Sequence, residues 1–119
     1  MIEPISRAYV VRRGDVWVGE TFRFLSATGA SFWSSVAVRS QIRTTSTATA
    51  IAHEFSVSPV VTTEGSNGVL TFTLSMTSVQ SEALAPGSYV GDIEISSSQL
   101  PKSTLVAFSF DVVSDVTRN

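Results

Sequence analysis

The sequence predicts one all-β domain, a sandwich of about seven antiparallel strands with one short helical turn near residues 78–84. The length of 119 residues fits a single domain. Ser and Thr together supply 33 residues and Val another 16, against a single Lys. This composition favours strands over helices, because β-branched side chains fit a pleated sheet better than a helix. Short segments in which apolar and polar residues alternate support the same prediction.

Seven segments show this alternation, at a spacing typical of a sandwich of two sheets. They are residues 7–13, 16–25, 35–43, 50–57, 69–76, 89–95 and 104–113. No connection between them accommodates a helix of ~10 residues, which excludes a parallel α/β fold.

The first four segments begin with an ambiguous strand that ends at Gly14-Asp15. In residues 16–25 we expect Phe22 and Phe24 on one side and a bulge or bend at Gly19. Residues 35–43 form a half-buried strand whose apolar face opposes a polar face of Arg39, Gln41 and Arg43. Residues 50–57 place Ile51, His53, Phe55 and Val57 on one side.

A turn at residues 64–68 opens the clearest strand, which buries Leu70, Phe72, Leu74 and Met76. The helical turn follows, with Ser78 as the candidate N-cap and Glu82 close to the position of a capping-box acid. The next strand directs Tyr89, Gly91, Ile93 and Ile95 inward and Asp92 and Glu94 outward. The last strand buries Val106, Phe108, Phe110 and Val112.

Charge and composition exclude several functions. The net charge of −2 lacks the basic footprint of a nucleic-acid-binding protein. The absence of Cys excludes disulfides, thiolate catalysis and Cys-ligated metals. No apolar run reaches the ~18–20 residues that cross a bilayer, and the first residues lack the pattern of a signal peptide. We therefore expect no membrane partner, no cofactor and synthesis in the cytoplasm.

Two parts of the chain resemble known families. The segment from Leu84 to Ile93 is similar to the turn that leads into strand F of immunoglobulin-like sandwiches, with Tyr89 at the tyrosine corner and Gly91 in the position of the conserved Cys. The corner needs only a backbone partner for the tyrosine hydroxyl. This resemblance implies an immunoglobulin-like sandwich.

The order of several short motifs resembles a group of small immunoglobulin-like structural proteins of tailed bacteriophages. The motifs are Arg13-Gly14-Asp15, Glu20-Thr21-Phe22-Arg23-Phe24, Val38-Arg39-Ser40-Gln41-Ile42-Arg43, and Leu84 followed by Gly87 and Tyr89. The match spans about residues 12–113 and departs at Phe32-Trp33-Ser34-Ser35, where such chains carry a polar turn.

The resemblance implies a non-enzymatic virion protein that binds other virion subunits. Capsid decoration, as a cement protein on the major capsid protein, is the favoured role, and a tail, neck or baseplate adaptor is the alternative. Self-association is also open. We expect residues 1–12 to form an N-terminal arm or first strand, residues 13–113 the sandwich, and residues 114–119 a C-terminal tail.

Five residues are candidates for a partner interface. They are Trp17, Phe32, Trp33, Arg39 and Arg43. Aromatic residues in a Gly/Ser-rich loop are typical of protein interfaces, although burial is an equal alternative for the Phe32-Trp33 pair and a core position the better one for Trp17. The arginines offer bidentate partners for carboxylates, or pair across strands with Asp92 and Glu94.

Two other classes of function stay open. A carbohydrate- or peptide-binding module would use the aromatic loop for stacking. A small hydrolase would need His53, but His53 and Glu54 lie on opposite faces of a strand and no nucleophile-elbow motif occurs. Asp92, Glu94, Asp111 and Asp115 are candidate Ca²⁺ ligands without a calcium-loop motif, so we expect no metal site.

Overall fold

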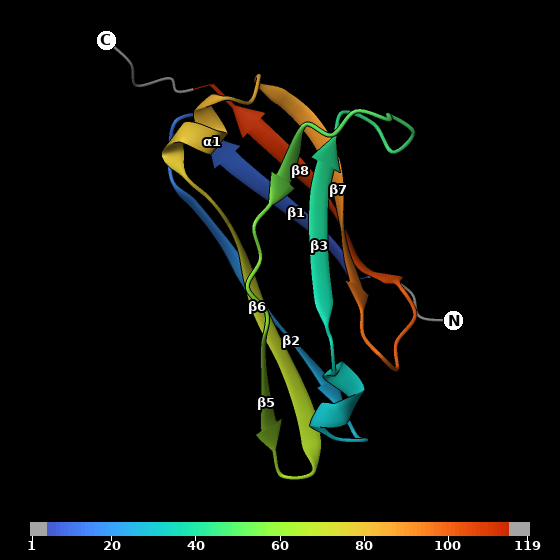
Figure 1. Ribbon diagram of the computed structural model, residues 1–119. Helices are drawn as coiled ribbons and strands as arrows, with labels where there is room; N and C mark the ends of the chain where they lie inside the picture. The colour runs from blue at the N-terminus through green and yellow to red at the C-terminus, as the bar shows by residue number, and fades with distance from the viewer. Residues whose placement is uncertain (1–4, 115–119) are drawn as a thin grey trace.

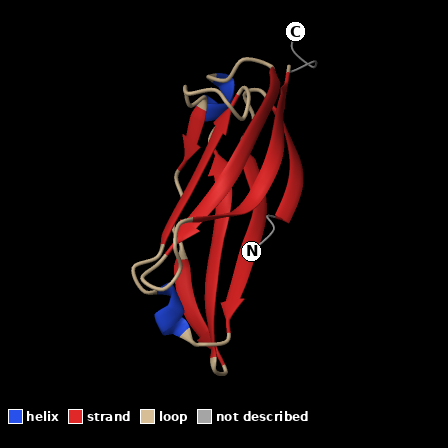
Figure 2. Ribbon diagram, turned by 90° about the vertical axis from the view of Figure 1, so that its right-hand side faces the viewer, coloured by secondary structure: helices blue, strands red, loops and turns tan. Residues whose placement is uncertain are grey.

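The computed structural model describes residues 5–114, which form a two-layer β-sandwich about 54 × 28 × 20 Å in size (Figures 1 and 2). The larger sheet has five strands in the order β1-β8-β7-β3-β4, and the smaller sheet has three in the order β2-β6-β5. This arrangement is immunoglobulin-like, with β2, β6 and β5 in the places of strands B, E and D and β3, β7 and β8 in those of C, F and G. The predicted all-β sandwich is confirmed.

The elements follow the alternating segments of the sequence closely. The five-stranded sheet contains β1 (Ile5–Arg12), β3 (Ala37–Arg43), β4 (His53–Phe55), β7 (Gly87–Ser96) and β8 (Ser103–Val113). The three-stranded sheet contains β2 (Trp17–Ser26), β5 (Val60–Glu64) and β6 (Asn67–Met76). Two short helices complete the described chain, the 3-10 turn η1 (Ala30–Trp33) and α1 (Ser78–Glu82). The bulge expected at Gly19 is present, because the β2–β6 register shifts between Val18 and Thr21.

The structure differs from the prediction in three elements. The described chain has eight strands, because β5 was not predicted: all five of its side chains are exposed, so it has no buried face to mark it. The 3-10 turn η1 was not predicted either. Strand β1 pairs with β8 in parallel, not antiparallel, with Ile5 opposite Val106. Only residues 13–16 separate β1 from β2, so the chain crosses to the other sheet and leaves β1 beside β8.

The predicted terminal segments lie only partly within the described residues. From Ile5 onward the predicted N-terminal arm is strand β1 and belongs to the sheet. Residues 1–4 lie outside the described residues, and so does the predicted C-terminal tail after Ser114.

A cluster of aromatic rings joins the two sheets. Trp17, at the start of β2, packs edge-to-face on Tyr9 and Phe110, with ring centroids 5.4 and 5.0 Å away. Phe55 and Phe108 lie in the same cluster. Such pairs add to the stability that burial alone provides. The core prediction for Trp17 therefore holds.

Helix α1 is capped one residue earlier than predicted. Thr77, not Ser78, is the N-cap: its Oγ1 accepts a hydrogen bond from Gln80 N at 3.1 Å, and Gln80 Oε1 accepts one from Thr77 N at 2.9 Å. Gln80 thus replaces Glu82 in the capping box. With Ser78 as the N-cap, the residue that completes the capping box would be Ser81, three positions later. The Ser81 hydroxyl instead accepts a hydrogen bond from Gly14 N and donates one to the carbonyl oxygen of Asp15.

The tyrosine corner forms as the sequence implied. Tyr89 is buried and its hydroxyl donates to the carbonyl oxygen of Ala85 at 2.6 Å. This bond ties the start of β7 to the segment that leaves α1, and no cysteine takes part in it.

Removing the corner bond should destabilise the domain. We expect Tyr89→Phe to lower the free energy of unfolding by about 0.5–1.5 kcal/mol, the net contribution of a typical hydrogen bond, because the Ala85 carbonyl loses this donor. Urea denaturation measures this change. Ser88→Ala, at the exposed neighbouring position, should change stability by no more than about 0.5 kcal/mol. Equal stability of Tyr89→Phe and the wild type would show that the corner bond contributes nothing.

Candidate protein-interaction surface

Trp33 is a core residue, which corrects its place among the interface candidates. Its side chain is 4% exposed, and its Nε1 donates to the carbonyl oxygen of Gly68 at 3.1 Å. The bond holds η1 against β6. A side chain at Gly68 would collide with the start of η1, because a Cβ there would overlap the carbonyl group of Gly29. Trp17 is partly buried and packs against the core.

Phe32, by contrast, lines an apolar cavity of about 250 Å³ at the end of the sandwich opposite α1. Its lining residues are Ile5, Phe24, Leu25, Ser26, Phe32, Trp33, Leu100 and Leu105. Ile5 and Leu25 are 37% and 48% exposed, so the cavity is open at its rim. The structure therefore brings the N-terminal strand β1 together with the aromatic loop that holds Phe32.

Hydrogen bonds from the β7–β8 loop fix the wall of this cavity. Ser97 Oγ donates to the carbonyl oxygen of Phe32, and Ser98 N donates to that of Ser34 at 2.8 Å. Phe32 also packs edge-to-face on Trp33, with centroids 4.9 Å apart. The apolar surface is thus held in place within the single chain, and a partner would bind it at little cost in ordering.

Sequence reasoning missed most of the cavity residues. Ile5, Leu25, Leu100 and Leu105 come from three strands and a loop, and nothing in their spacing places them together. The alternation in β2 placed Phe24 on the inner face but assigned no role to Leu25.

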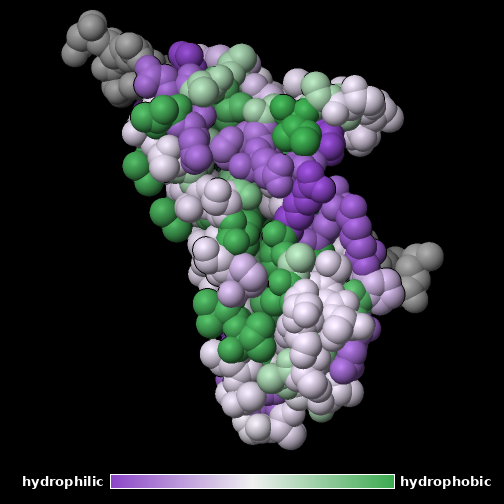
Figure 3. All heavy atoms as spheres, viewed as in Figure 1, coloured by the Kyte–Doolittle hydropathy of each residue, from purple (hydrophilic) through white to green (hydrophobic). Residues whose placement is uncertain are grey.

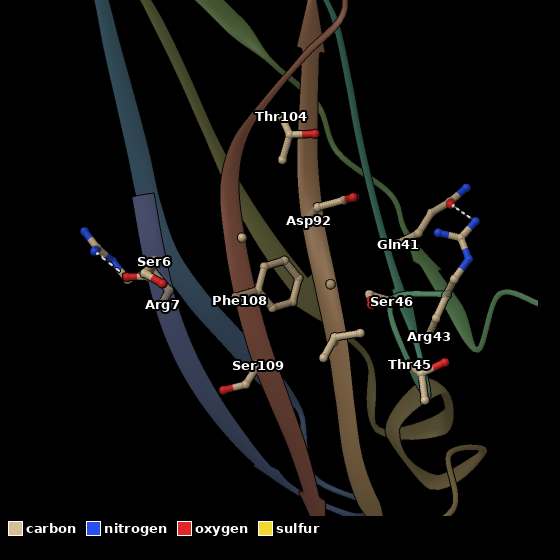
Figure 4. Close-up of a pocket in the computed structure, with 13 residues that line it drawn as sticks. Ser6, Arg7, Gln41, Arg43, Thr45, Ser46, Asp92, Thr104, Phe108 and Ser109 are labelled. Carbon is tan, nitrogen blue, oxygen red and sulfur yellow. Dashed lines mark hydrogen bonds between the residues drawn. The ribbon is translucent and has the colours of Figure 1, made fainter. Parts of the chain in front are cut away.

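A second hollow, of about 510 Å³ and named here the polar groove because most of its lining residues are polar, lies across the five-stranded sheet (Figure 4). Its lining residues are Ser6, Arg7, Gln41, Arg43, Thr45, Ser46, Val90, Gly91, Asp92, Thr104, Ala107, Phe108 and Ser109. Arg43 is the one interface candidate in this polar groove. Its Nη2 donates to Gln41 Oε1 at 2.9 Å, and its Nε has no hydrogen-bond partner.

The arginines on β3 do not form ion pairs with Asp92 or Glu94, which corrects the cross-strand alternative. Arg39 pairs with Glu54 on β4 at 3.3 Å, and Gln41 Nε2 donates to the other oxygen of the same carboxylate. Glu94 pairs with Lys102 at 3.5 Å. Figure 3 shows the resulting band of hydrophilic residues over β3 and β4. An exposed pair such as Arg39–Glu54 contributes little to stability.

His53, the residue on which a hydrolase would depend, lies against an aromatic ring. The imidazole of His53 packs edge-to-face on Phe55, and its buried Nε2 has no partner. Burial lowers the pKa of His53, and Glu54 opposes this shift. Within residues 5–114, no group of three His, Cys, Asp or Glu side chains is placed to hold a metal ion.

Comparisons with known proteins assign no family. No family model matches the chain, and no curated protein matches it significantly. Among solved structures it is similar to AggA, the major subunit of aggregative adherence fimbriae type I from Escherichia coli, at 12% identity and a TM-score of 0.36. That alignment covers 93% of this chain and 91% of AggA, but a score this low supports no inference. Among the described helices, none has the length and apolar character needed to span a membrane.

Asp92, which lines the polar groove, makes the stability of the domain depend on pH. Its pKa is raised, first by burial and then by the neighbouring Glu94 carboxylate, while Arg43 and Lys102 oppose the shift. The folded state therefore binds this proton more tightly than the unfolded state, so the contribution of Asp92 to stability is lost as the pH rises through its folded pKa.

Replacing Asp92 should therefore stabilise the domain at neutral pH. We expect Asp92→Asn to raise the free energy of unfolding at pH ~7 and to give a smaller gain at pH ~3, where the wild-type carboxyl is protonated. Denaturant unfolding at both pH values measures the difference. A variant that is less stable than the wild type at neutral pH would contradict the assignment.

Proposed function

We propose that this chain is a non-enzymatic structural protein of a tailed-bacteriophage virion that works by binding other virion subunits. The observation that carries the proposal is the preformed apolar cavity, where β1, the end of β2 and η1 meet. The order of the motifs from Arg13 to Tyr89, which resembles small phage structural proteins, supplies the virion context.

The size and lining of the cavity favour a protein partner over a small molecule. At about 250 Å³ it falls below the ~300–1,000 Å³ of typical small-molecule sites, and its rim residues are aliphatic or aromatic. Such a cavity fits one or two apolar side chains from a neighbouring subunit. Burying one of them contributes about 1.5–3 kcal/mol before the costs of association.

Within this class, we favour capsid decoration, with β1 and Phe32 in contact with the major capsid protein. A tail, neck or baseplate adaptor is the alternative, since the same apolar contact would serve in a ring. The polar groove supports a second function, a peptide- or carbohydrate-binding module. That function is less favoured because the one aromatic ring in the groove, Phe108, is buried in the floor, where it offers no open face for stacking.

The copy number in purified particles tests the proposal. Quantitative mass spectrometry of the phage that encodes this chain should find hundreds of copies, on a multiple of the capsid lattice, if the protein decorates the capsid. Six or twelve copies would place it in the tail or neck. Complete absence from particles would overturn the virion proposal and raise the binding-module alternative.

Variants of the cavity then test the contact itself. Phe32→Ala and Leu25→Ala should each weaken binding to particles that lack the protein by roughly tenfold, the effect of losing ~1.4 kcal/mol of contact energy. Val79→Ala is the matched control, because Val79 is 76% exposed on α1 at the other end of the molecule. Unfolding midpoints verify that each variant is folded. Unchanged binding by both cavity variants would exclude the cavity as the contact.

A further inference from the structure

The sandwich has four sheet edges, and they differ in how they are protected from pairing with another chain. The edge strands are β1 and β4 in the larger sheet and β2 and β5 in the smaller sheet. Exposed edges present unpaired backbone groups, which proteins usually guard with charges, bulges or very short strands.

Three of these edges carry such protection. Strand β1 contains Arg7 and Arg12, and Arg7 forms an ion pair at 2.7 Å with Glu20 of β2. Strand β2 is bulged between Val18 and Thr21. Strand β4 has only three residues, and one of them is the ion-paired Glu54.

Strand β5 has no basic residue and no bulge, and its single charge lies at the turn. Its sequence is Val60-Val61-Thr62-Thr63-Glu64, four neutral β-branched residues and one acid at the turn. Val60 and Val61 are 55% and 37% exposed, and Figure 3 shows hydrophobic residues gathered over the start of this strand. Glu64 already has a counterion, Arg23 on β2. From Val60 to Thr63 the edge is thus uncharged and exposed.

The hairpin fixes which backbone groups of β5 face outward. Glu64 pairs with Asn67 across a two-residue turn in which Gly65 has φ 63°, the geometry of a type II′ hairpin. In such a hairpin the flanking pair exchanges hydrogen bonds, and the pattern then alternates along the strand. The N–H and C=O groups of Val61 and Thr63 therefore point away from β6.

We infer that β5 pairs antiparallel with β5 of a second copy of this chain, about a two-fold axis at Thr62. In this register Val61 of each copy exchanges two hydrogen bonds with Thr63 of the other, giving four in all, and Thr62 lies directly opposite Thr62. Val60 lies opposite Glu64 of the second copy, so no like charges meet. Two identical strands in this register thus satisfy each other's outward backbone groups without opposing like charges, and on this ground we assign a second copy of this chain as the occupant.

The inference does not depend on the virion proposal. A five-residue edge is a small interface, so we expect a weak dimer with a Kd between about 10 μM and 1 mM. The two three-stranded sheets would join into one continuous sheet of six strands.

Variants that carry opposite charges at position 62 test both the pairing of β5 with its copy and the register of that pairing. Sedimentation equilibrium up to ~1 mM should show dimers of the wild type, while Thr62→Lys and Thr62→Glu should each stay monomeric, because like charges lie directly opposite. An equal mixture of the two variants should dimerise again. Val18→Lys, on the bulged edge, is the control and should dimerise like the wild type, since Val18 is 68% exposed and outside β5.

Amide hydrogen exchange of the wild type gives a second measurement that needs no substitution. Raising the concentration should slow exchange at Val61 and Thr63, while Val60 and Thr62, already bonded to β6, should change little. A wild type that is monomeric at ~1 mM, or a dimer that persists in both single variants, would overturn the inference. A mixture of the two variants that fails to dimerise would overturn the proposed register. Slower amide exchange in β5 only when a different protein is added would overturn the dimer and assign the edge to that protein.

Discussion

The packing of aromatic rings between the two sheets is the constraint on which the rest of the structure depends. Trp17 reaches from the smaller sheet to Tyr9 and Phe110 of the larger one, and Phe108 fills the space beside them. A side chain at Gly91 would displace this packing, since a Cβ there would lie 2.5 Å from the Phe108 ring and 2.7 Å from Ile42 Cγ2. Rings thus hold together the two sheets that a disulfide joins in antibody domains. Gly91 and Phe108 also line the polar groove on the larger sheet.

Two buried aromatic side chains close the ends of the sandwich through bonds to the backbone. At the α1 end the Tyr89 hydroxyl donates to the carbonyl oxygen of Ala85. At the η1 end the Trp33 Nε1 donates to the carbonyl oxygen of Gly68. Figure 1 shows that the smaller sheet extends past the larger one at the η1 end. The core is therefore incomplete there, which leaves both the apolar cavity around Phe32 and the exposed strand β5. The surfaces proposed for binding are thus a consequence of the unequal sheets.

The sequence predicted what depends on local periodicity and missed what depends on tertiary contact. The alternation from Leu70 to Met76 predicted β6, and the Gly87-Ser88-Tyr89 segment predicted the tyrosine corner. Strand β5 gave no signal, because alternation marks a strand only where one face is buried. The burial of Trp33 depends on a glycine 35 positions away, and the apolar cavity joins Ile5 to Leu100. Neither relation is visible in a single sequence.

Site-specific photo-crosslinking in assembled particles tests most directly the claim that the apolar end of the sandwich is where the chain binds its neighbours. A photoreactive phenylalanine analogue placed at Leu25, on the rim of the cavity, should crosslink to another virion protein in high yield. The same probe at Val79 on α1 should crosslink weakly or not at all. Crosslinks from Val79 or from Ser109 in the polar groove, with none from Leu25, would contradict the account and move the contact to another face.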